Sequence, residues 1–500
     1  MSDRYTEPTY APGTPHRSPG IFGQGLVGTV VLLLGVIVGI FTITFAGYVA
    51  GLVAFALVAL VLAPLTIRVG HRSGGQWLLA RLAWAWHRRH RRHLYRSGVL
   101  SLVPGGSYRL PGVLASIEAY EFTTGLGQKF AVLHMPAVGM WTAFVSCQPE
   151  GSELVDAEEQ DRRVAGWAGF LGNLSRLPDL VAAAQTVEAV PDQGSRLAAE
   201  VDRIRDPDAP EMGQRALLEA VESMPRGQAR LTSRLALTWR TTLSAGRRSK
   251  EDRPEAMASH IAAYLPGICQ VLLQAGAGYC VPMSLGDIAA DVRSAFSLEA
   301  AARIEAKTVA GGEAGIGWAD CGPTGAQEAW AEYRHDDAKS VTWAMAAGPQ
   351  GAVFRTALRA LLTPDSEVPR KRLTMLYRPY QQGQARREAD RAKKTARFHA
   401  SKNPHGNAFE SVAMRAAERT EQELAHGASM LSWTMFVTAT VAADADLDQA
   451  VVNVQDAAIG ADIELRRCYG HQAAGFAAGL GVGVVPSMLV QVPPMLRDNL

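Results

Sequence analysis

Residues 85–96 have the most distinctive chemistry in the chain, because they read AWHRRHRRHLYR and hold five arginines and three histidines. Arginines at this density are typical of phosphate contacts, whereas regularly spaced histidines are typical of metal sites. His87, His90 and His93 recur every three residues and would share roughly one helix face. Their neighbours are cationic, which repels a metal ion. The pattern therefore favours phosphate over metal, and no cofactor is expected.

A second basic stretch occupies residues 370–399 and includes one long predicted helix. Tyr377, Tyr380 and Phe398 lie among its cations, as aromatic residues do in single-strand nucleic-acid binders. Two acidic residues dilute the positive charge, so a solvated face or a protein contact is the other interpretation. The cations that would make a nucleic-acid contact are Arg386, Arg387, Arg391, Lys393, Lys394 and Arg397.

The sequence offers little catalytic chemistry. No G-x-x-x-x-G-K-[ST] loop for nucleotide phosphates occurs, and neither do G-x-S-x-G or H-E-x-x-H motifs. The stretch YRHDDAKS places His335 beside Asp336 and Asp337. Adjacent residues of an extended segment point to opposite faces, so these three do not simply converge on one site. We expect a turn before a strand there, and no enzymatic activity.

The overall charge and the cysteines exclude further classes of protein. Lys and Arg total 50 and Asp and Glu total 48, so no global basic field attracts nucleic acid. The five cysteines are scattered, without a C-x-x-C pair, which is typical neither of a disulfide framework nor of a zinc site. They are Cys147, Cys269, Cys280, Cys321 and Cys468. We expect buried, reduced thiols.

An uncharged run precedes the first basic stretch. Residues 20–67 hold no charged side chain and contain two apolar segments, separated by a predicted turn at residues 42–48. A membrane-spanning helix needs about 20 apolar residues, so the run is long enough for a two-helix transmembrane hairpin. Two buried helices of a soluble protein are the alternative. Because arginines follow the run and none lies in the turn, both termini are expected in the cytoplasm, beginning with a tail at residues 1–19.

Residues 68–96 then form a predicted basic juxtamembrane helix that lies on the inner surface of the cell membrane. Its tryptophans would sit at the bilayer interface and its arginines would meet anionic headgroups. The predicted membrane-surface contacts are Trp77, Trp84, Trp86, Arg88, Arg89, Arg91, Arg92 and Arg96.

After a Gly- and Pro-rich connector, runs typical of strands and helices alternate to the end of the chain. The fold class is therefore α+β, with a first cytoplasmic unit at residues 105–310 and a second at residues 311–500. Strands are expected at residues 112–122, 128–135, 140–147, 180–190, 229–240, 278–283, 339–349, 371–380, 429–442 and 462–469. Helices are expected at residues 154–177, 214–224, 256–276, 352–362, 384–426 and 447–461, and the region at 384–426 is interrupted near residues 401–407. The similar strand runs LTWR, VTWAM and LSWTMF suggest two related units with antiparallel sheets.

The segment GFAAGLGVGVVPSML near the C-terminus is apolar and rich in glycine. It is too interrupted for a third span. Two interpretations stay open: an exposed contact for a partner protein, or a segment that packs on the sheet of its own domain.

Several stretches carry a resemblance to a known family. The opening MSDRYTEPTY, the two apolar segments, and the motifs LLARLAW, YRHDDAKSVTWAM, RKRLTMLYRPY and ARFHASK resemble integral membrane proteins of actinobacteria encoded with conjugation and type IV secretion genes. The arrangement also resembles a fusion of two components of VirB-type machines. The N-terminus is similar to their small two-span inner-membrane subunit, and the remainder is similar to the N-terminal, non-motor domain of their assembly ATPase.

The resemblance implies a function without implying catalytic residues. It suggests a non-enzymatic inner-membrane scaffold of a type IV secretion or conjugation apparatus. Its implied partners are the lipid bilayer, a separate conjugation-type P-loop ATPase and other subunits of the secretion channel, in an oligomeric machine. The alternative is a membrane-anchored protein that binds single-stranded nucleic acid during DNA transfer, which a steep salt dependence would reveal.

Overall fold

The computed structural model describes most of the chain beyond residue 72. The described ranges are residues 72–101, 108–149, 155–191, 195–206, 208–223, 229–241, 253–349, 353–363, 368–402 and 408–489, with short pieces between residues 37 and 69 and the single residues 151 and 365. The helices are α2 (Gly74–Arg89), α3 (Ala157–Asn173), α4 (Ser195–Ile204), α5 (Glu211–Ser223), α6 (Pro254–Leu272), α7 (Leu285–Phe296), α8 (Leu298–Val309), α9 (Arg359–Leu362), α10 (Gln382–Lys402), α11 (Ala408–Ala425), α12 (Leu447–Gly460), α13 (Gln472–Gly479) and α14 (Pro486–Leu489).

The strands are β1 (Arg68–Val69), β2 (Arg72–Ser73), β3 (Leu94–Arg96), β4 (Glu118–Thr123), β5 (Lys129–Met135), β6 (Met140–Gln148), β7 (Leu180–Pro191), β8 (Ala229–Arg240), β9 (Tyr279–Pro282), β10 (Gly325–Glu328), β11 (Tyr333–His335), β12 (Ala338–Ala347), β13 (Arg370–Pro379), β14 (Leu431–Ala442) and β15 (Glu464–Arg467). The predicted mixture of helices and strands is confirmed. Two predicted elements differ: residues 112–116 form a 3-10 turn instead of the start of a strand, and the helix expected at 352–362 is only the short α9. The elements α4, α7, α8, α13, β10 and β11 were not predicted.

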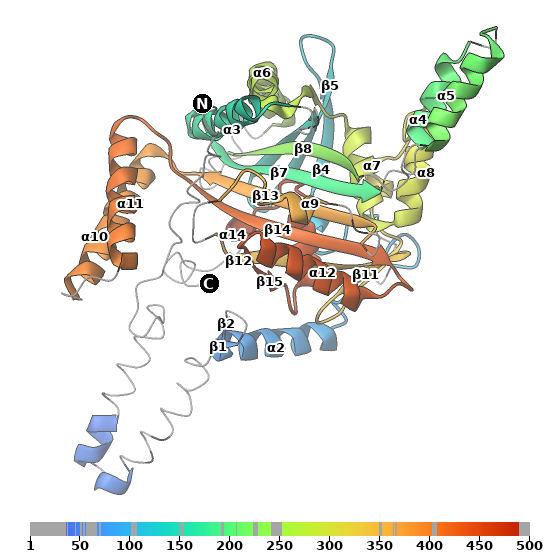
Figure 1. Cartoon of the computed structure of the whole chain (residues 1–500). Helices are drawn as coiled ribbons and strands as arrows, with labels where there is room; N and C mark the ends of the chain where they lie inside the picture. Colours follow the sequence, from blue (N-terminus) through green and yellow to red (C-terminus); the bar gives the residue numbers. More distant parts are fainter. Residues whose placement is uncertain are drawn as a thin grey trace.

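One 13-stranded sheet forms the centre of the molecule (Figure 1). Its order is β3-β10-β11-β12-β14-β13-β7-β8-β6-β5-β4, with β15 paired to β12 and β9 paired to β6. All of the pairings recorded between these strands are antiparallel. The α+β class, with an antiparallel sheet, is therefore what the described part of the chain has.

The succession of elements in the sheet occurs twice. A three-strand meander, a helix, a long strand, a helical hairpin, a second long strand, a helix and a short strand run from β4 to β9, and the same succession runs from β10 to β15. The registers agree as well. Residues 140–147 pair with residues 240–233, and residues 338–344 pair with residues 442–436. The two halves meet where β7 pairs with β13, with Thr186 opposite Thr374.

Helices cover both faces of the sheet. On one face, α3 and α6 pack on the strands of the first half, and α9 and α12 pack on those of the second (Figure 1). On the other face lie α7, α13 and the chain that follows α13. The hairpins α4–α5 and α10–α11 extend away from the sheet in different directions.

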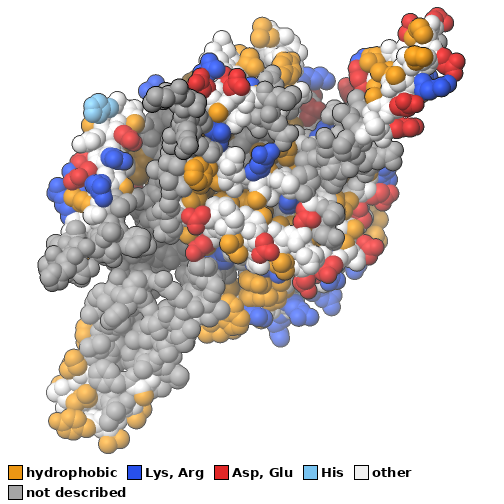
Figure 2. Space-filling model, viewed as in Figure 1, with side chains coloured by type: hydrophobic (Ala, Val, Ile, Leu, Met, Phe, Trp, Pro, Cys, Tyr) orange, Lys and Arg blue, Asp and Glu red, His pale blue; other side chains and the backbone are white. Residues whose placement is uncertain are grey.

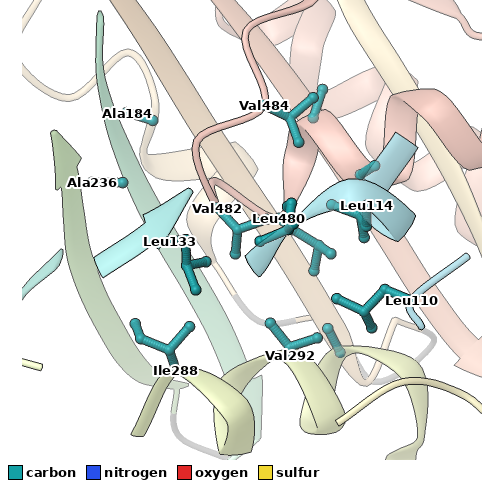
Figure 3. Close-up of a cluster of buried hydrophobic side chains, with 14 of the residues drawn as sticks. Leu110, Leu114, Leu133, Ala184, Ala236, Ile288, Val292, Leu480, Val482 and Val484 are labelled. Carbon is teal, nitrogen blue, oxygen red and sulfur yellow. The ribbon is translucent and has the colours of Figure 1, made fainter. Parts of the chain in front are cut away.

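The C-terminal glycine-rich segment crosses the strands on this second face. Phe476, Leu480, Val482 and Val485 are buried, and Figure 3 shows Leu480, Val482 and Val484 among core side chains of the sheet and α7. The strands present buried threonines beneath it, joined in the pairs Thr142–Thr238, Thr186–Thr374 and Thr342–Thr438 at Oγ1–Oγ1 distances of 3.0, 3.1 and 3.0 Å. Of the two interpretations of this segment, packing on its own sheet is the one found.

The predicted transmembrane hairpin at residues 20–67 lies largely outside the described residues. Residues 39–45 within it are helical, and Gly47, in the predicted turn, has a φ of 86°. The hairpin stays a prediction. In the part of the chain that the structure describes, one helix has the length and hydropathy to cross a bilayer, Pro254–Ala277. One side of it, with Ile261 and Leu265, is buried in the core against the sheet.

Candidate membrane-facing surface and buried polar sites

Helix α2 lies beside the sheet domain and has two unlike sides. Its last turn carries His87, Arg88 and Arg89, and the two arginines are cations that interact favourably with the negative end of a helix dipole. One side of α2 faces the domain. The ring centroids of Trp77 and Trp84 lie 6.5 and 6.2 Å from that of Trp330, in edge-to-face geometry. This spacing of seven residues brings the two tryptophans to the same helix side.

Cation–π contacts reinforce this attachment. The guanidinium of Arg81 lies 4.7 Å from the ring centroid of Trp77 and 4.2 Å from that of Trp330. Such contacts are worth about 0.5–1 kcal/mol each at exposed sites. Because β3 follows shortly after α2 and pairs with β10, the chain holds the helix to the domain at its C-terminal end as well.

The opposite side of α2 is apolar and open. Leu78, Leu79, Leu82 and Trp86 are 50, 67, 59 and 50% exposed, respectively. Their spacing of three or four residues places them on one helix face. Figure 2 shows hydrophobic and basic side chains side by side along the lower edge of the molecule, where Figure 1 places α2. A contiguous exposed apolar face of this kind indicates an interaction site.

The predicted arginines surround the end of this apolar face. Arg88, Arg89, Arg91, Arg92 and Arg96 are all exposed. The guanidinium of Arg92 lies 4.4 Å from the ring centroid of Trp86. Among the described residues, no carboxylate forms an ion pair with any of the five. Apolar and cationic groups are thus presented together, and both remain free to meet another surface.

The structure corrects three details of the predicted juxtamembrane helix. The helix covers Gly74–Arg89 and not residues 68–96, because Arg91 has a left-handed φ of 54° and ends the helical path. Arg96 therefore lies on strand β3, at the edge of the sheet. Trp77 and Trp84, both predicted at the membrane surface, face Trp330 instead of the open side, because the helical period carries them to the same side of α2. Trp86 is exposed, and its contact with the membrane stays a prediction.

A buried carboxylate lies under α2. Glu328 Oε2 is 3.5 Å from His87 Nε2, and Glu328 Oε1 accepts a hydrogen bond of 2.9 Å from the backbone N–H of Ala473 at the start of α13. Burial raises the pKa of Glu328 to about 7. Burial, together with the nearby His93 and Arg92, lowers the pKa of His87. His87 therefore contacts the domain, and no group of three or more metal-ligating side chains occurs among the described residues.

The second predicted site lies on α10, in the projecting hairpin α10–α11. Arg386, Arg387, Arg391, Lys394 and Arg397 are exposed, whereas Lys393 is half-buried and pairs with Glu421 of α11. Two other cations have acidic neighbours on α10 itself: Lys394 with Asp390 at 2.7 Å and Arg391 with Glu388 at 3.6 Å. The predicted aromatic interleaving is wrong for Tyr377, which is 5% exposed and belongs to the core.

The structure shows a buried charge cluster that the sequence analysis missed. Glu188 of β7 receives two hydrogen bonds from Arg370, at 2.8 and 2.9 Å, and two from Arg372, at 2.9 and 2.6 Å. Burial alone would raise the pKa of Glu188, but the two guanidiniums outweigh it and hold the pKa well below its usual range. Arg234 on β8 pairs with Asp291 of α7 at 2.7 Å. In the sequence, the only sign of this buried charge cluster was the alternation of polar residues along the strands.

The cluster around His335 is structural as well. Its Nδ1 donates to the backbone oxygen of Phe296 at 2.6 Å, and its Nε2 lies 2.8 Å from Ser340 Oγ. Burial lowers the pKa of His335 to about 4. Asp336 turns away to pair with Arg293 at 2.7 Å, and Asp337 accepts from the backbone N–H of Glu299. As predicted, the three side chains do not converge, but His335 is fully buried instead of lying in a solvated turn.

Comparison with known proteins gives a match at the N-terminal end of the chain. A family model described as a domain of unknown function, DUF8461, matches residues 17–76. This region covers the uncharged run and the first residues of α2, and leaves the sheet domain unmatched. No curated protein matches the sequence.

Proposed function

We propose that the protein is a non-enzymatic membrane scaffold whose α2 seats the α+β domain on an anionic bilayer surface. The observation that carries this proposal is the two-sided character of α2. One side is fixed to the domain by Trp77, Arg81 and Trp84, and the other presents Leu79, Leu82 and Trp86 beside arginines that form no ion pair with any described carboxylate. The uncharged run of residues 20–67 precedes this helix directly and supplies the anchor, a multi-pass hairpin in the cell membrane.

The energies suit a surface contact that depends on lipid charge. Apolar side chains at the depth of the headgroups contribute according to their buried area. Each arginine near an anionic leaflet contributes about 1 kcal/mol, so the four at the end of α2 (Arg88, Arg89, Arg91 and Arg92) together exceed the thermal energy several-fold. Because α2 packs on Trp330 and continues into β3 of the sheet, this contact would orient the sheet relative to the bilayer.

The setting of this scaffold follows from the sequence resemblance. We assign it to a type IV secretion or conjugation apparatus, where the domain would recruit a separate P-loop ATPase beside other channel subunits. A tether raises the effective concentration of two weakly interacting domains without any new contact. The projecting hairpins α4–α5 and α10–α11 are suitable contact arms. The repeated element order and registers further support two related units in the domain.

The test uses the full chain in lipid nanodiscs. We expect amide hydrogen exchange in α2 to be slower in anionic than in zwitterionic lipid, because bound lipid covers the helix. Replacing Arg88, Arg89, Arg91 and Arg92 by Gln should remove that difference. The matched control replaces Arg386, Arg387, Arg391 and Arg397 of α10 by Gln and should leave it unchanged. Equal exchange of α2 in both lipids would contradict the seating of this helix.

Topology and catalysis give separate checks. A cysteine introduced at Gly47 should react with an impermeant thiol reagent outside intact cells, whereas one at Ser2 should not, because both termini are proposed to be cytoplasmic. Labelling at Ser2 would overturn the orientation. The purified chain should hydrolyse no ATP, and turnover that follows the chain through purification would contradict the non-enzymatic scaffold.

The alternative function is binding of single-stranded nucleic acid, and the exposed cations of α10 favour it. In that case the α10 control variant would lose binding, and affinity would fall steeply with salt concentration because phosphate contacts release counterions. The acidic residues Asp390, Glu388 and Glu421 compete for the same cations, which weighs against this alternative.

A further inference from the structure

Three of the five cysteines lie in one hydrophobic cluster, although Cys147 is more than a hundred residues from the other two in the sequence. Cys147 on β6 and Cys280 on β9 are opposite each other in the antiparallel register. Cys269 lies on α6, which leads into β9 through Leu273–Ala277, and its charge state is affected by Cys280. Sequence spacing gave no sign of this grouping, because β9 pairs with a strand more than a hundred residues earlier.

The backbone geometry of the first two suits a disulfide bond. Directly opposite residues of antiparallel strands have Cα atoms about 4.5 or about 5.5 Å apart, depending on the kind of pair. Disulfides form across Cα separations of about 4.4–6.8 Å. Their side chains already interact: the Cys147 thiol hydrogen-bonds to Cys280. Both residues are free thiols in this structure.

The three thiols differ in reactivity. The hydrogen bond from Cys147 lowers the pKa of the half-buried Cys280 thiol. Burial raises the pKa of Cys269 to about 11, and the pKa of the 3%-exposed Cys147 is raised by its hydrogen bond to Cys280 and by burial. Since the thiolate is the nucleophile, Cys280 is the group that reacts first with a reagent from solvent.

We infer that Cys147 and Cys280 form a thiol–disulfide exchange site that takes a low-molecular-weight disulfide as its oxidant. The Cys280 thiolate attacks one sulfur of the small disulfide, which releases one small thiolate and leaves a mixed disulfide on Cys280. Cys147 then loses its proton and attacks the Cys280 sulfur, which releases the second small thiolate. Two protein thiols are oxidised and one small disulfide is reduced to two thiols.

The position of this bond gives it a structural consequence. Strand β9 connects α6, which packs on one face of the sheet, to α7, which packs on the other. Tyr279–Pro282 pairs with β6 there, and the backbone N–H of Met283 donates to the oxygen of Phe144. A covalent bond between Cys147 and Cys280 would hold this crossing against the sheet, so oxidation should slow the local opening of β9 without rearranging the fold.

The test titrates the full chain in detergent against glutathione and glutathione disulfide at fixed total concentration. On oxidation, peptide mapping of the unsubstituted chain should show that two free thiols per chain are lost and that one disulfide, Cys147–Cys280, has formed. Reduced glutathione alone should reduce this disulfide again. Hydrogen exchange in β9 should slow on oxidation. If Cys147 and Cys280 remain thiols at every ratio, or if Cys269 takes part in the linked pair, the inference is wrong.

Serine variants assign the roles. In the Cys147→Ser variant, the reaction should stop at a mixed disulfide with one glutathionyl group on Cys280. The Cys280→Ser variant should form neither a mixed disulfide with glutathione nor an internal disulfide. Cys269→Ser is the matched control and should behave as the unsubstituted chain does. Glutathionylation at Cys147 in the Cys280→Ser variant would overturn the assignment of the attacking thiol. Formation of the disulfide is tested on the unsubstituted chain, so the inference remains testable even if one of the variants fails to fold.

Discussion

Two buried glutamates show how surroundings decide the behaviour of a single residue. Glu188 and Glu328 are 6 and 8% exposed. Glu188 has two guanidiniums in contact, and its pKa lies well below its usual range. Glu328 has backbone N–H donors and His87 beside it, and the pKa of His87 is lowered. The pKa of Glu328 therefore rises to about 7. Burial opposes the charged form in both, and only the cations of Arg370 and Arg372 overcome it.

Glu328 predicts a defined pH dependence of stability. Its folded pKa of about 7 lies above the ordinary value of 4.5, so the folded state binds more protons than the unfolded state between these values. This group therefore makes folding less stable as pH rises through that window. Relative to the unsubstituted chain, Glu328→Gln should gain stability from about pH 4.5 to pH 7, measured by thermal unfolding in matched buffers. A constant difference across this range would disprove the raised pKa.

At the scale of elements, the close approach of the C-terminal segment to the sheet depends on glycine. Gly481 and Gly483 have φ values of 64 and 84°, and a Cβ at either would collide with Oγ1 of Thr186 or Thr142. Without side chains at these positions, the segment lies directly on the threonine pairs, and Leu480, Val482 and Val485 fill the spaces between them.

The Gly483→Ala substitution should lower the free energy of unfolding by more than the backbone strain of the left-handed conformation alone would. Gly427 has a similar φ of 89° with no atom within 4 Å of a built Cβ, so Gly427→Ala is the matched control. The control variant should lose about 1–2 kcal/mol of unfolding free energy, because alanine is strained in the left-handed conformation. At Gly483 the new methyl group also meets Thr142 Cβ at 2.9 Å, and overpacking of this kind adds about 1–3 kcal/mol. Equal losses in urea unfolding would show that the segment does not press on the strand.

On the scale of the whole molecule, the two halves of the sheet share one junction. Strands β7 and β13 pair along it, and Glu188 of the first half is held by Arg370 and Arg372 of the second. The core on the side of α7 and α13 also contains residues of both halves, including Leu133, Ala184, Leu376 and Phe476. The halves are thus joined by backbone hydrogen bonds, ion pairs and a continuous apolar layer.

Glu188→Gln should therefore destabilise both halves together. Removing one partner of a buried ion pair leaves uncompensated charge and costs about 3–5 kcal/mol. Hydrogen exchange should accelerate in β8 of the first half and in β14 of the second. The exposed pair Glu200–Arg203 on α4 gives the control: Glu200→Gln should change neither. Faster exchange confined to one half would mean that the junction does not couple them.

Local sequence determined most of the secondary structure. Strands with alternating or continuous apolar residues, such as 140–148 and 431–442, were predictable because side-chain period and β-branched content are properties of short segments. The separation of α10 from α11 followed from the Asn, Pro and Gly of residues 403–407. The exposure of Arg88, Arg89 and Trp86 was also predictable, since charge clusters of this density remain in contact with solvent or headgroups.

Only the tertiary structure decided which of these groups meet. Glu188 lies 182 positions before Arg370, and Cys147 lies 133 before Cys280, since strand pairing between distant segments has no local signature. Trp84 is a further example: the sequence predicted it at the bilayer, whereas in the fold it packs against Trp330 of the domain. For the glycine-rich C-terminal segment, the sequence left an exposed contact and packing on its own sheet both open. The structure places Gly475–Val485 on the sheet, because the role of its glycines depends on the threonines opposite. Residue types and periods are local, whereas proximity is a property of the complete fold.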